Sequence, residues 1–199
     1  GSLAMALKKA SAQLDGGDFS IGRAESDSSI KAFIDMKRVK QAKRIVKLCH
    51  SMHVDLVLPS DFILETGEVA ETIPQDKLQM DIGPKSQKAI AGKIREYIRQ
   101  YSSLDTKSVV FYNGVFGKFE DDRFAEGTKS FIPLLKEMTK AGILTYVGGG
   151  EGRLALVKYG SLEDVTHAFT CGGTILKSLT DYHISYLKAM YIQNTVILK

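Results

Sequence analysis

Three glycine-centred turns constrain this chain more than any other feature, because each follows an apolar run that predicts a β-strand. They occupy residues 112–120 (YNGVFGKFE), 148–152 (GGGEG) and 171–174 (CGGT). Glycines between a strand and a helix let the backbone approach a ligand closely, and the following helix presents unpaired N–H groups to an anion. An ordinary turn needs one glycine rather than a cluster. The pattern therefore predicts a phosphate site; the alternative is three plain strand-to-helix connections.

Strands and helices alternate along the chain in the predicted secondary structure. The strands expected from apolar runs are 54–58, 109–112, 143–147 and 165–170. The helices expected from apolar residues at helical spacing are 3–14, 35–52, 86–101, 124–138, 153–159 and 174–179. Ser86 is expected to cap the third helix, and Pro133 to kink or delay the fourth. The remaining segments are predicted as an irregular stretch (15–34), a loop (61–81) and a tail ambiguous between helix and strand (181–199).

This alternation predicts the fold class α/β, a three-layer, Rossmann-like domain with a mostly parallel sheet and helices on both faces. Ligands bind such sheets outside the carboxyl ends of the strands, and all three glycine turns lie at those ends. With 199 residues, of which 44% are hydrophobic and 25% charged, the chain has the size of one such domain, spanning residues 1–199.

Composition excludes several other classes of protein. The two cysteines, Cys49 and Cys171, lie far apart and indicate neither a metal cluster nor a disulfide framework, which favours a reducing compartment such as the cytoplasm. No run approaches the ~20 apolar residues that a membrane span needs. The net charge of +4 suits an anionic ligand, but Lys and Arg are spread along the chain, so we expect no nucleic-acid partner.

Six short motifs follow one another along the chain. They are GSLAMAL at residues 1–7, LPSD at 58–61, DIGPKS at 81–86, YNGVFGKFE at 112–120, GGGE at 148–151 and CGGTI at 171–175. The order of these motifs and their amino-acid sequences resemble the C-terminal, nucleotide-binding half of phosphoglycerate kinase through most of the chain. The resemblance implies a partial C-terminal domain of a divergent member of that family. The family's N-terminal half, and the Gly-Gly-Ala-Lys strand end upstream, have no counterpart in this sequence.

The resemblance implies reversible phosphoryl transfer between 1,3-bisphosphoglycerate and ADP in glycolysis, with Mg²⁺ and ADP or ATP bound by this half. It assigns Glu151 to the magnesium ion, Glu120 to the ribose hydroxyls and Met80 to the base pocket. It assigns Asn113 to the nucleotide phosphates and the transferring phosphoryl group to Gly172, Gly173 and Thr174. Nucleotide binding is also assigned to Gly114, Gly148, Gly149 and Gly150. From the residues alone, other roles stay open: Asn113 as a turn cap, Glu120 as a solvated carboxylate, Met80 as a core side chain.

Several positions depart from the family pattern. They are Val115 in place of a proline, Glu151 of an aspartate, Gly152 of a hydroxyl residue, Cys171 of a glycine and Ile175 of a serine. These departures keep a second interpretation open, a non-catalytic nucleotide-binding or scaffold relative. A nicotinamide-binding domain is disfavoured because no Gly-x-Gly-x-x-Gly opens a helix after the first strand. Since the N-terminal domain would hold 3-phosphoglycerate, we expect no turnover by this chain alone, and a monomer at full length.

Overall fold

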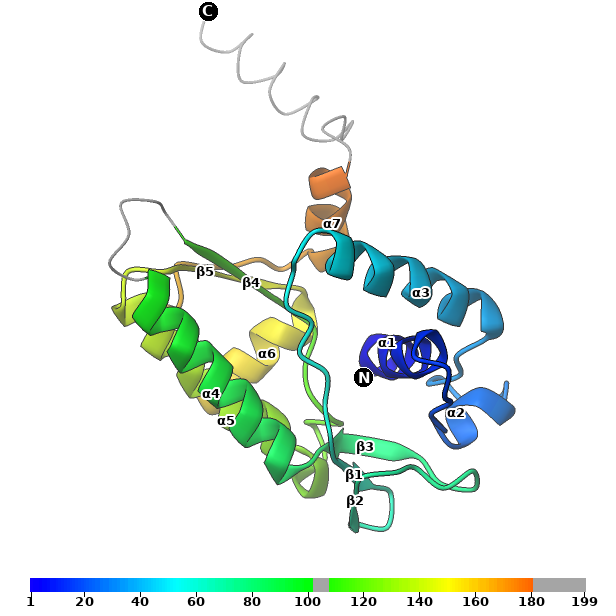
Figure 1. Cartoon of the computed structure of the whole chain (residues 1–199). Coiled ribbons are helices and arrows are strands. Elements are labelled where there is room, and N and C mark those ends of the chain that lie inside the picture. The colour runs from blue at the N-terminus through cyan, green and yellow to red at the C-terminus, as the bar shows by residue number, and fades with distance from the viewer. Residues whose placement is uncertain (102–107, 181–199) are drawn as a thin grey trace, which may run out of the picture.

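The computed structural model describes residues 1–101 and 108–180, which form two units, with the extended segment 54–58 running between them in space (Figure 1). The N-terminal unit contains α1 (Ser2–Leu14), α2 (Arg23–Ser26), α3 (Met36–Ser51), β1 (Phe62–Leu64), β2 (Val69–Ala70) and β3 (Gln79–Ile82). The parallel unit contains α4 (Pro84–Tyr101), β4 (Val109–Asn113), α5 (Glu126–Lys140), β5 (Leu144–Gly148), α6 (Gly150–Tyr159), β6 (His167–Ala168), α7 (Gly172–Thr180) and two 3₁₀ helices, η1 (Asp122–Phe124) and η2 (Leu162–Asp164). The tail 181–199 lies outside the described residues.

The strands β4, β5 and β6 form a parallel sheet in that order, which confirms the predicted α/β, Rossmann-like fold. The register places Asn113 beside Gly148, the last residues of β4 and β5. Helices α5 and α6 pack against β5. The buried face of α5 carries Ile132, Leu135 and Met138, at the spacing that one helix face requires. The carboxyl ends of the strands therefore meet at one edge of the sheet, where the glycine turns begin.

Helices α6 and α7 begin earlier than predicted, inside the glycine clusters. The N–H of Arg153 donates to the carbonyl of Gly149 (3.1 Å), and the N–H of Ile175 donates to the carbonyl of Cys171 (3.2 Å). Glycine has low helix propensity and is not part of an apolar pattern. The predicted start of each helix therefore lies after the start seen in the structure. The helix N-termini consequently lie within the turns themselves.

The other predicted helices are found with small differences. Asp35 caps α3 by accepting the N–H of Arg38 (2.8 Å), as its position before the apolar pattern suggests. Phe124 lies in η1 rather than in α5, and Pro133 lies inside α5, which continues to Lys140. The stretch predicted as irregular, 15–34, contains the one-turn helix α2. None of the helices within residues 1–101 and 108–180 has the length and apolarity needed to cross a bilayer.

A second, antiparallel sheet lies in the N-terminal unit, with the strand order β2-β1-β3. The loop predicted for residues 61–81 is therefore wrong. The N–H of Leu64 donates to the carbonyl of Glu68 (2.8 Å), and Gly67 adopts a φ of 88°, which closes a tight turn between β1 and β2. These strands have only two to four residues, too few for an alternating pattern to be recognised.

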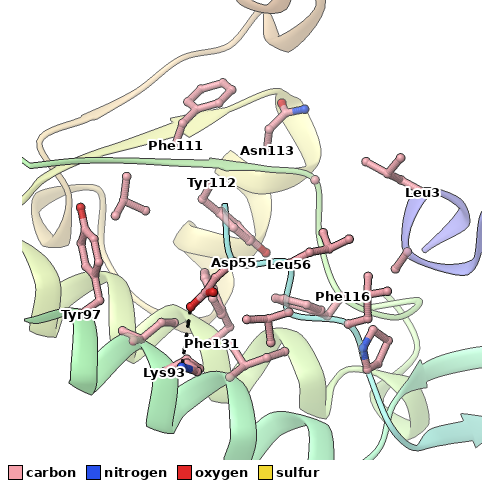
Figure 2. A pocket seen from close by; sticks show the side chains of 18 of the residues that line it. Leu3, Asp55, Leu56, Lys93, Tyr97, Phe111, Tyr112, Asn113, Phe116 and Phe131 are labelled. Atoms are coloured by element: carbon pink, nitrogen blue, oxygen red, sulfur yellow. Dashed lines mark ion pairs between the residues drawn. The ribbon is translucent and has the colours of Figure 1, made fainter. Parts of the chain in front are cut away.

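The segment 54–58 is predicted to be a buried strand, and this prediction is also wrong. The segment is extended, but it pairs with no strand among the described residues. Val54 and Val57 are 54% and 44% exposed. A strand is stabilised by hydrogen bonds to its neighbours, so an apolar run without a neighbour does not join a sheet. Instead, the segment forms one wall of a groove whose other wall is β4 (Figure 2).

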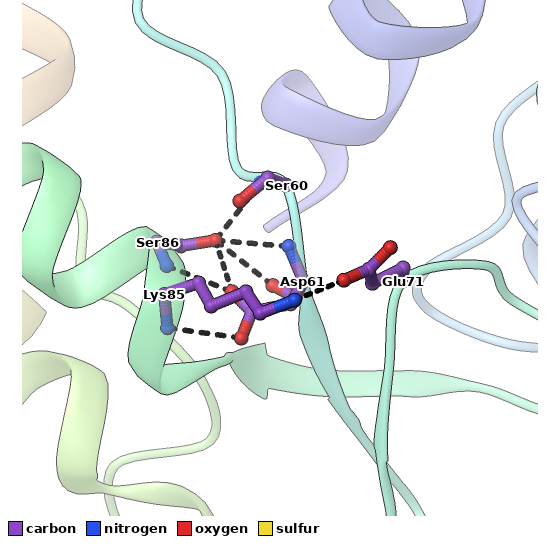
Figure 3. Close-up of polar contacts among 5 residues, drawn as sticks. All are labelled: Ser60, Asp61, Glu71, Lys85 and Ser86. Carbon is purple, nitrogen blue, oxygen red and sulfur yellow. Dashed lines mark hydrogen bonds and ion pairs between the residues drawn. The ribbon is translucent and has the colours of Figure 1, made fainter.

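The N-terminus of α4 is capped by Asp61 rather than by Ser86 (Figure 3). The buried Asp61 carboxylate accepts the backbone N–H groups of Lys85 (3.0 Å) and Ser86 (2.8 Å) and the hydroxyl of Ser86 (2.6 Å). The Ser86 hydroxyl also accepts the N–H of Ser60 (2.9 Å). Burial acts to raise the pKa of Asp61, but these hydrogen bonds outweigh it and hold the pKa below its ordinary value. Sequence spacing cannot reveal this cap, because Asp61 lies far from α4 in the chain.

Candidate functional site

The three glycine turns meet at the carboxyl edge of the parallel sheet. A Cβ added at Gly172 would lie 2.9 Å from the Cα of Gly149 and 3.2 Å from the Oδ1 of Asn113. A Cβ added at Gly148 would lie 2.8 Å from the same oxygen. Three segments separated along the chain are thus in contact, with the Asn113 amide between them. Side chains at Gly148 and Gly172 would separate these segments, which explains why both are glycines.

Open space adjoins this contact. A Cβ added at Gly114, Gly150 or Gly173 would meet no atom within 4 Å. Gly149 adopts a φ of 86°, a backbone conformation that favours glycine, and leads directly into α6. The N-termini of α6 and α7 both open onto this region, so unpaired N–H groups and the positive ends of two helix dipoles lie there together. This geometry suits an anion with several oxygens, such as a polyphosphate.

Two carboxylates predicted for the site are exposed. Glu151 lies in the first turn of α6, beside the glycine cluster. Glu120 lies at the end of the loop 112–120, whose Phe119 carbonyl accepts the hydroxyl of Tyr159 (3.0 Å) at the far end of α6. Within the described residues, no three His, Cys, Asp or Glu side chains are grouped to hold a metal ion. A single carboxylate fits a magnesium ion held mainly by phosphates and water, which is how Mg²⁺ is commonly bound.

The predicted base-pocket residue Met80 lies on β3, half-buried, in the antiparallel sheet. Its carbonyl accepts the N–H of Lys118 (3.1 Å), which ties β3 to the loop 112–120. Met80 is therefore linked to the outer part of this loop, whereas Asn113, at the loop's start, lies beside Gly148. Thr174 lies exposed in the first turn of α7.

Sequence reasoning missed the residues that hold the loop 112–120 in place. The fully buried Thr128 accepts the N–H of Phe116 (3.0 Å) and donates to its carbonyl (2.6 Å). Asp81, also fully buried, accepts the N–H of Gly127 in the first turn of α5 (2.7 Å). A Cβ at Gly117 would lie 2.5 Å from the Asp81 carboxylate, so this glycine serves close packing. Asp81 begins the DIGPKS motif, which could have identified it from the sequence. Thr128 lies in none of the six motifs.

The family model for phosphoglycerate kinase matches residues 7–181, most of the chain. This chain belongs to the phosphoglycerate kinase family. A phosphoglycerate kinase of Bifidobacterium longum (strain DJO10A) is 33% identical over 199 aligned residues, which cover 92% of this chain and 47% of the relative. A phosphoglycerate kinase of Synechococcus sp. (strain JA-3-3Ab) is 30% identical over 195 residues, covering 92% and 45%. The chain therefore spans about half the length of the curated phosphoglycerate kinases it matches.

The fold agrees with that of a solved phosphoglycerate kinase. The structure of phosphoglycerate kinase from Coxiella burnetii superposes with a TM-score of 0.67 at 21% sequence identity. The superposition covers 90% of this chain and 42% of that one. The likeness therefore extends over both the N-terminal unit and the parallel unit.

Proposed function

We propose that this chain supplies the Mg-ADP/ATP site of a phosphoglycerate kinase, which transfers a phosphoryl group reversibly between 1,3-bisphosphoglycerate and ADP in glycolysis, in the cytoplasm. The observation that supports this most is the contact of Asn113 with the turns at Gly148–Gly149 and Gly172, next to two helix N-termini. Phosphoryl transfer needs little covalent help from the protein. It requires alignment of the reacting oxygens and stabilisation of the negative charge around the phosphorus.

Each part of the site has a distinct task in this proposal. The backbone N–H groups at Gly172, Gly173 and Thr174 surround the transferring phosphoryl group, and the Asn113 amide and the turn 148–150 orient the nucleotide phosphates. Glu151 holds the magnesium ion, which when bound neutralises charge on the phosphate oxygens. Glu120 bonds the ribose and Met80 lines the base pocket. Binding of 3-phosphoglycerate requires the N-terminal domain of the family, so this chain alone binds nucleotide without turnover and acts in a monomeric full-length enzyme.

A second function, a non-catalytic nucleotide-binding or scaffold relative, is favoured by one specific observation. Gly152 follows Glu151 where the resembling motif has a hydroxyl residue, and a Cβ there would lie 3.1 Å from Val147 Cγ1. The buried Gly152 therefore serves the close approach of α6 to β5 rather than a polar contact. Cys171 is exposed at the start of the last turn, where the resembling motif has a glycine.

The first test measures nucleotide binding and its dependence on Glu151. Calorimetry should detect ADP and ATP binding by the folded chain. Glu151→Gln should lower the affinity for the magnesium-nucleotide complex more than the affinity for the metal-free nucleotide, because the substitution removes the carboxylate charge that attracts the metal. Glu151→Asp should retain or improve magnesium-dependent affinity. Glu68→Gln, in the exposed β1–β2 turn, is the matched control. No heat with any adenine nucleotide would contradict the nucleotide site; an unchanged Glu151→Gln variant would support the scaffold alternative.

The second test concerns Gly173, where the added side chain of Gly173→Val projects into open space and the backbone has no positive φ. We expect the variant to keep its melting temperature and to bind ATP less well than the parent, by about 0.3–2 kcal/mol, the range for a charge at a helix N-terminus. ADP binding should change less, because Gly173 is assigned to the transferring phosphoryl group. Gly92→Val in α4, also open, is the control. Equal loss for ADP and ATP would contradict this assignment.

A further inference from the structure

Helix α3 carries more basic residues than any other described helix or strand. Its 16 residues include no Asp or Glu, and six of them are cations: Lys37, Arg38, Lys40, Lys43, Arg44 and Lys47. All of these except the half-buried Lys43 are exposed. The net charge of the whole chain is only +4, so the residues outside α3 include more acidic than basic side chains. This one helix therefore accounts for the positive excess of the chain.

The cations of α3 are not neutralised by the rest of the described chain. None of the ion pairs found within residues 1–101 and 108–180 includes a side chain of α3. The guanidinium of Arg38 donates to a carbonyl, that of Phe33. The neighbouring helix α1 has no acidic residue either. A group of cations without acidic partners, on an exposed surface, attracts an anionic partner.

Three apolar side chains lie exposed beside these cations. Ile45, Leu48 and Met52 are 42%, 57% and 63% exposed. Their spacing of three and four residues places them in one row along the helix surface. Arg44 lies one turn before Leu48, so this cation borders the row. The outer surface of α3 thus combines positive charge with an apolar row.

The fold does not use this apolar row. Helix α3 lies at the rim of the molecule and packs along α1 (Figure 1). The residues of α3 that belong to the hydrophobic core lie on the other side of the helix: Val39, Ala42 and Val46. Exposed apolar side chains gathered on one surface, with polar groups around them, indicate an interaction site.

A bilayer surface suits this combination better than a nucleic acid does. Interfaces with DNA are polar and strongly basic, and single strands bind by stacking their bases on aromatic side chains. Helix α3 has no aromatic residue, and its apolar row would gain nothing from phosphates. At a bilayer surface, anionic headgroups attract Lys and Arg while apolar side chains enter the boundary between headgroups and acyl chains. Such binding lies in the membrane plane and needs no spanning helix.

We propose that the outer surface of α3 binds the surface of a bilayer that contains anionic phospholipid. The helix lies along the membrane, with its cations at the lipid phosphates and Ile45, Leu48 and Met52 in the headgroup boundary. Each cation near an anionic surface increases the affinity about fivefold, and salt weakens this contribution. The glycine turns proposed to bind nucleotide belong to other elements, so this binding does not depend on the proposed function.

The test measures co-sedimentation of the full chain, without nucleotide, with vesicles of one part phosphatidylglycerol to two parts phosphatidylcholine. We expect binding at low salt that weakens at high salt, and little binding to vesicles of phosphatidylcholine alone. Two double variants with the same net charge locate the contact. Lys37→Glu with Arg44→Glu reverses two exposed cations of α3, and Lys88→Glu with Arg99→Glu reverses two exposed cations of α4. The α3 pair should lower the affinity at least tenfold, and the α4 pair should lower it far less.

A second pair of variants tests the apolar row. Leu48→Gln removes an apolar side chain from α3, and Leu154→Gln removes one from α6; the parent side chains are 57% and 59% exposed. Leu48→Gln should lower the affinity for the anionic vesicles roughly three- to tenfold, whereas Leu154→Gln should leave it unchanged. Both variants should keep the parent's melting temperature, because neither side chain belongs to a core.

Three results would overturn the proposal. They are the absence of binding to anionic vesicles at low salt, equal effects of the α3 and α4 charge reversals, and duplex DNA binding that is tighter than vesicle binding and unaffected by Leu48→Gln. The last result would assign the surface to nucleic acid. If the α3 reversal lowers the melting temperature, the milder pair Lys37→Gln with Arg44→Gln replaces it, and an unchanged affinity in that pair would equally contradict the proposal.

Discussion

The two units of this molecule differ in the direction of their strands, antiparallel in one and parallel in the other, and each has its own hydrophobic core. In the N-terminal unit, α1 packs along α3, and an isolated bridge joins Ile21 to Ile73 across the core. All of its elements come from residues 2–82. In the parallel unit, the sheet stops at β4, and Val109 at its edge is 54% exposed. The nucleotide site proposed here lies on the parallel unit, at the carboxyl ends of its strands, and the groove along β4 continues to Asn113 and Gly114 there.

This difference has consequences for stability. When two cores do not merge, a substitution in one of them weakens its own unit first, and the unfolding of the chain need not be a single all-or-none transition. The most informative variants are those that remove the same kind of buried group from each core and then compare the two units.

The largest expected effect comes from truncating the two cores. Phe62 and Leu135 are each 0% exposed, one in each core. Phe62→Ala should cost about 3–5 kcal/mol and Leu135→Ala about 2–5 kcal/mol, from lost burial and the cavity left behind. Hydrogen exchange should then accelerate mainly in α1 and α3 for Phe62→Ala, and mainly in β5 and α6 for Leu135→Ala.

Leu48→Ala serves as the control, because this α3 side chain is 57% exposed. It should change stability by no more than about 0.5 kcal/mol. Equal acceleration in both units by either core variant would show that the chain unfolds as one cooperative body, and the two cores would then not be energetically separate.

Two buried carboxylates near the junction of the units respond to pH in opposite directions. For Asp61, hydrogen bonds outweigh burial and the pKa lies below its ordinary value. For Asp81, burial outweighs the N–H groups of Gly127 and Ile82 and raises the pKa. Both accept an N–H group at the N-terminus of a helix, but Asp61 also has the Ser86 hydroxyl and the nearby charge of Lys85, whereas Asp81 lies near the like charge of Glu126.

Asp61→Asn and Asp81→Asn should therefore show opposite pH dependence. The stabilisation from Asp61 is present above the unfolded-state pKa of about 3.9 and is lost as the pH falls through its lower folded-state pKa. The contribution of Asp81 to the free energy of unfolding is most favourable when the pH is below its unfolded-state pKa of about 3.9. This contribution is lost as the pH rises through the raised folded-state pKa. At pH 7, Asp61→Asn should cost roughly 1.5–3 kcal/mol, as for a hydrogen bond to a charged group.

The measurement is urea unfolding of the parent and both variants between pH 3 and 7. The free energy of unfolding of the parent minus that of the variant should increase with rising pH for Asp61→Asn and decrease for Asp81→Asn. Differences that move in the same direction would contradict the opposite displacement of the two pKa values.

The sequence predicts the parallel unit better than its surroundings. Glycine clusters after apolar runs identify β4, β5 and β6 and the meeting of Asn113 with Gly148 and Gly172, because these signals are local and the topology of parallel sheets brings them together. The same local reasoning fails for 54–58, since an apolar run does not reveal whether a neighbouring strand exists. It also misses the very short β1 and β2, and it misses Asp61, whose capping role depends on the distant residues Lys85 and Ser86.

The smallest effect is expected on the surface of the parallel unit, where Arg95 of α4 meets Glu137 of α5 with two bonds of 3.1 Å. The two side chains are 54% and 41% exposed, so solvent and salt screen the pair. Arg95→Ala should cost about 0.2–1 kcal/mol, and a double-mutant cycle with Glu137→Ala should give a coupling that decreases at high salt. If the coupling instead exceeds the cost of Leu135→Ala, then α4 is held to this unit by charge more than by its apolar contacts.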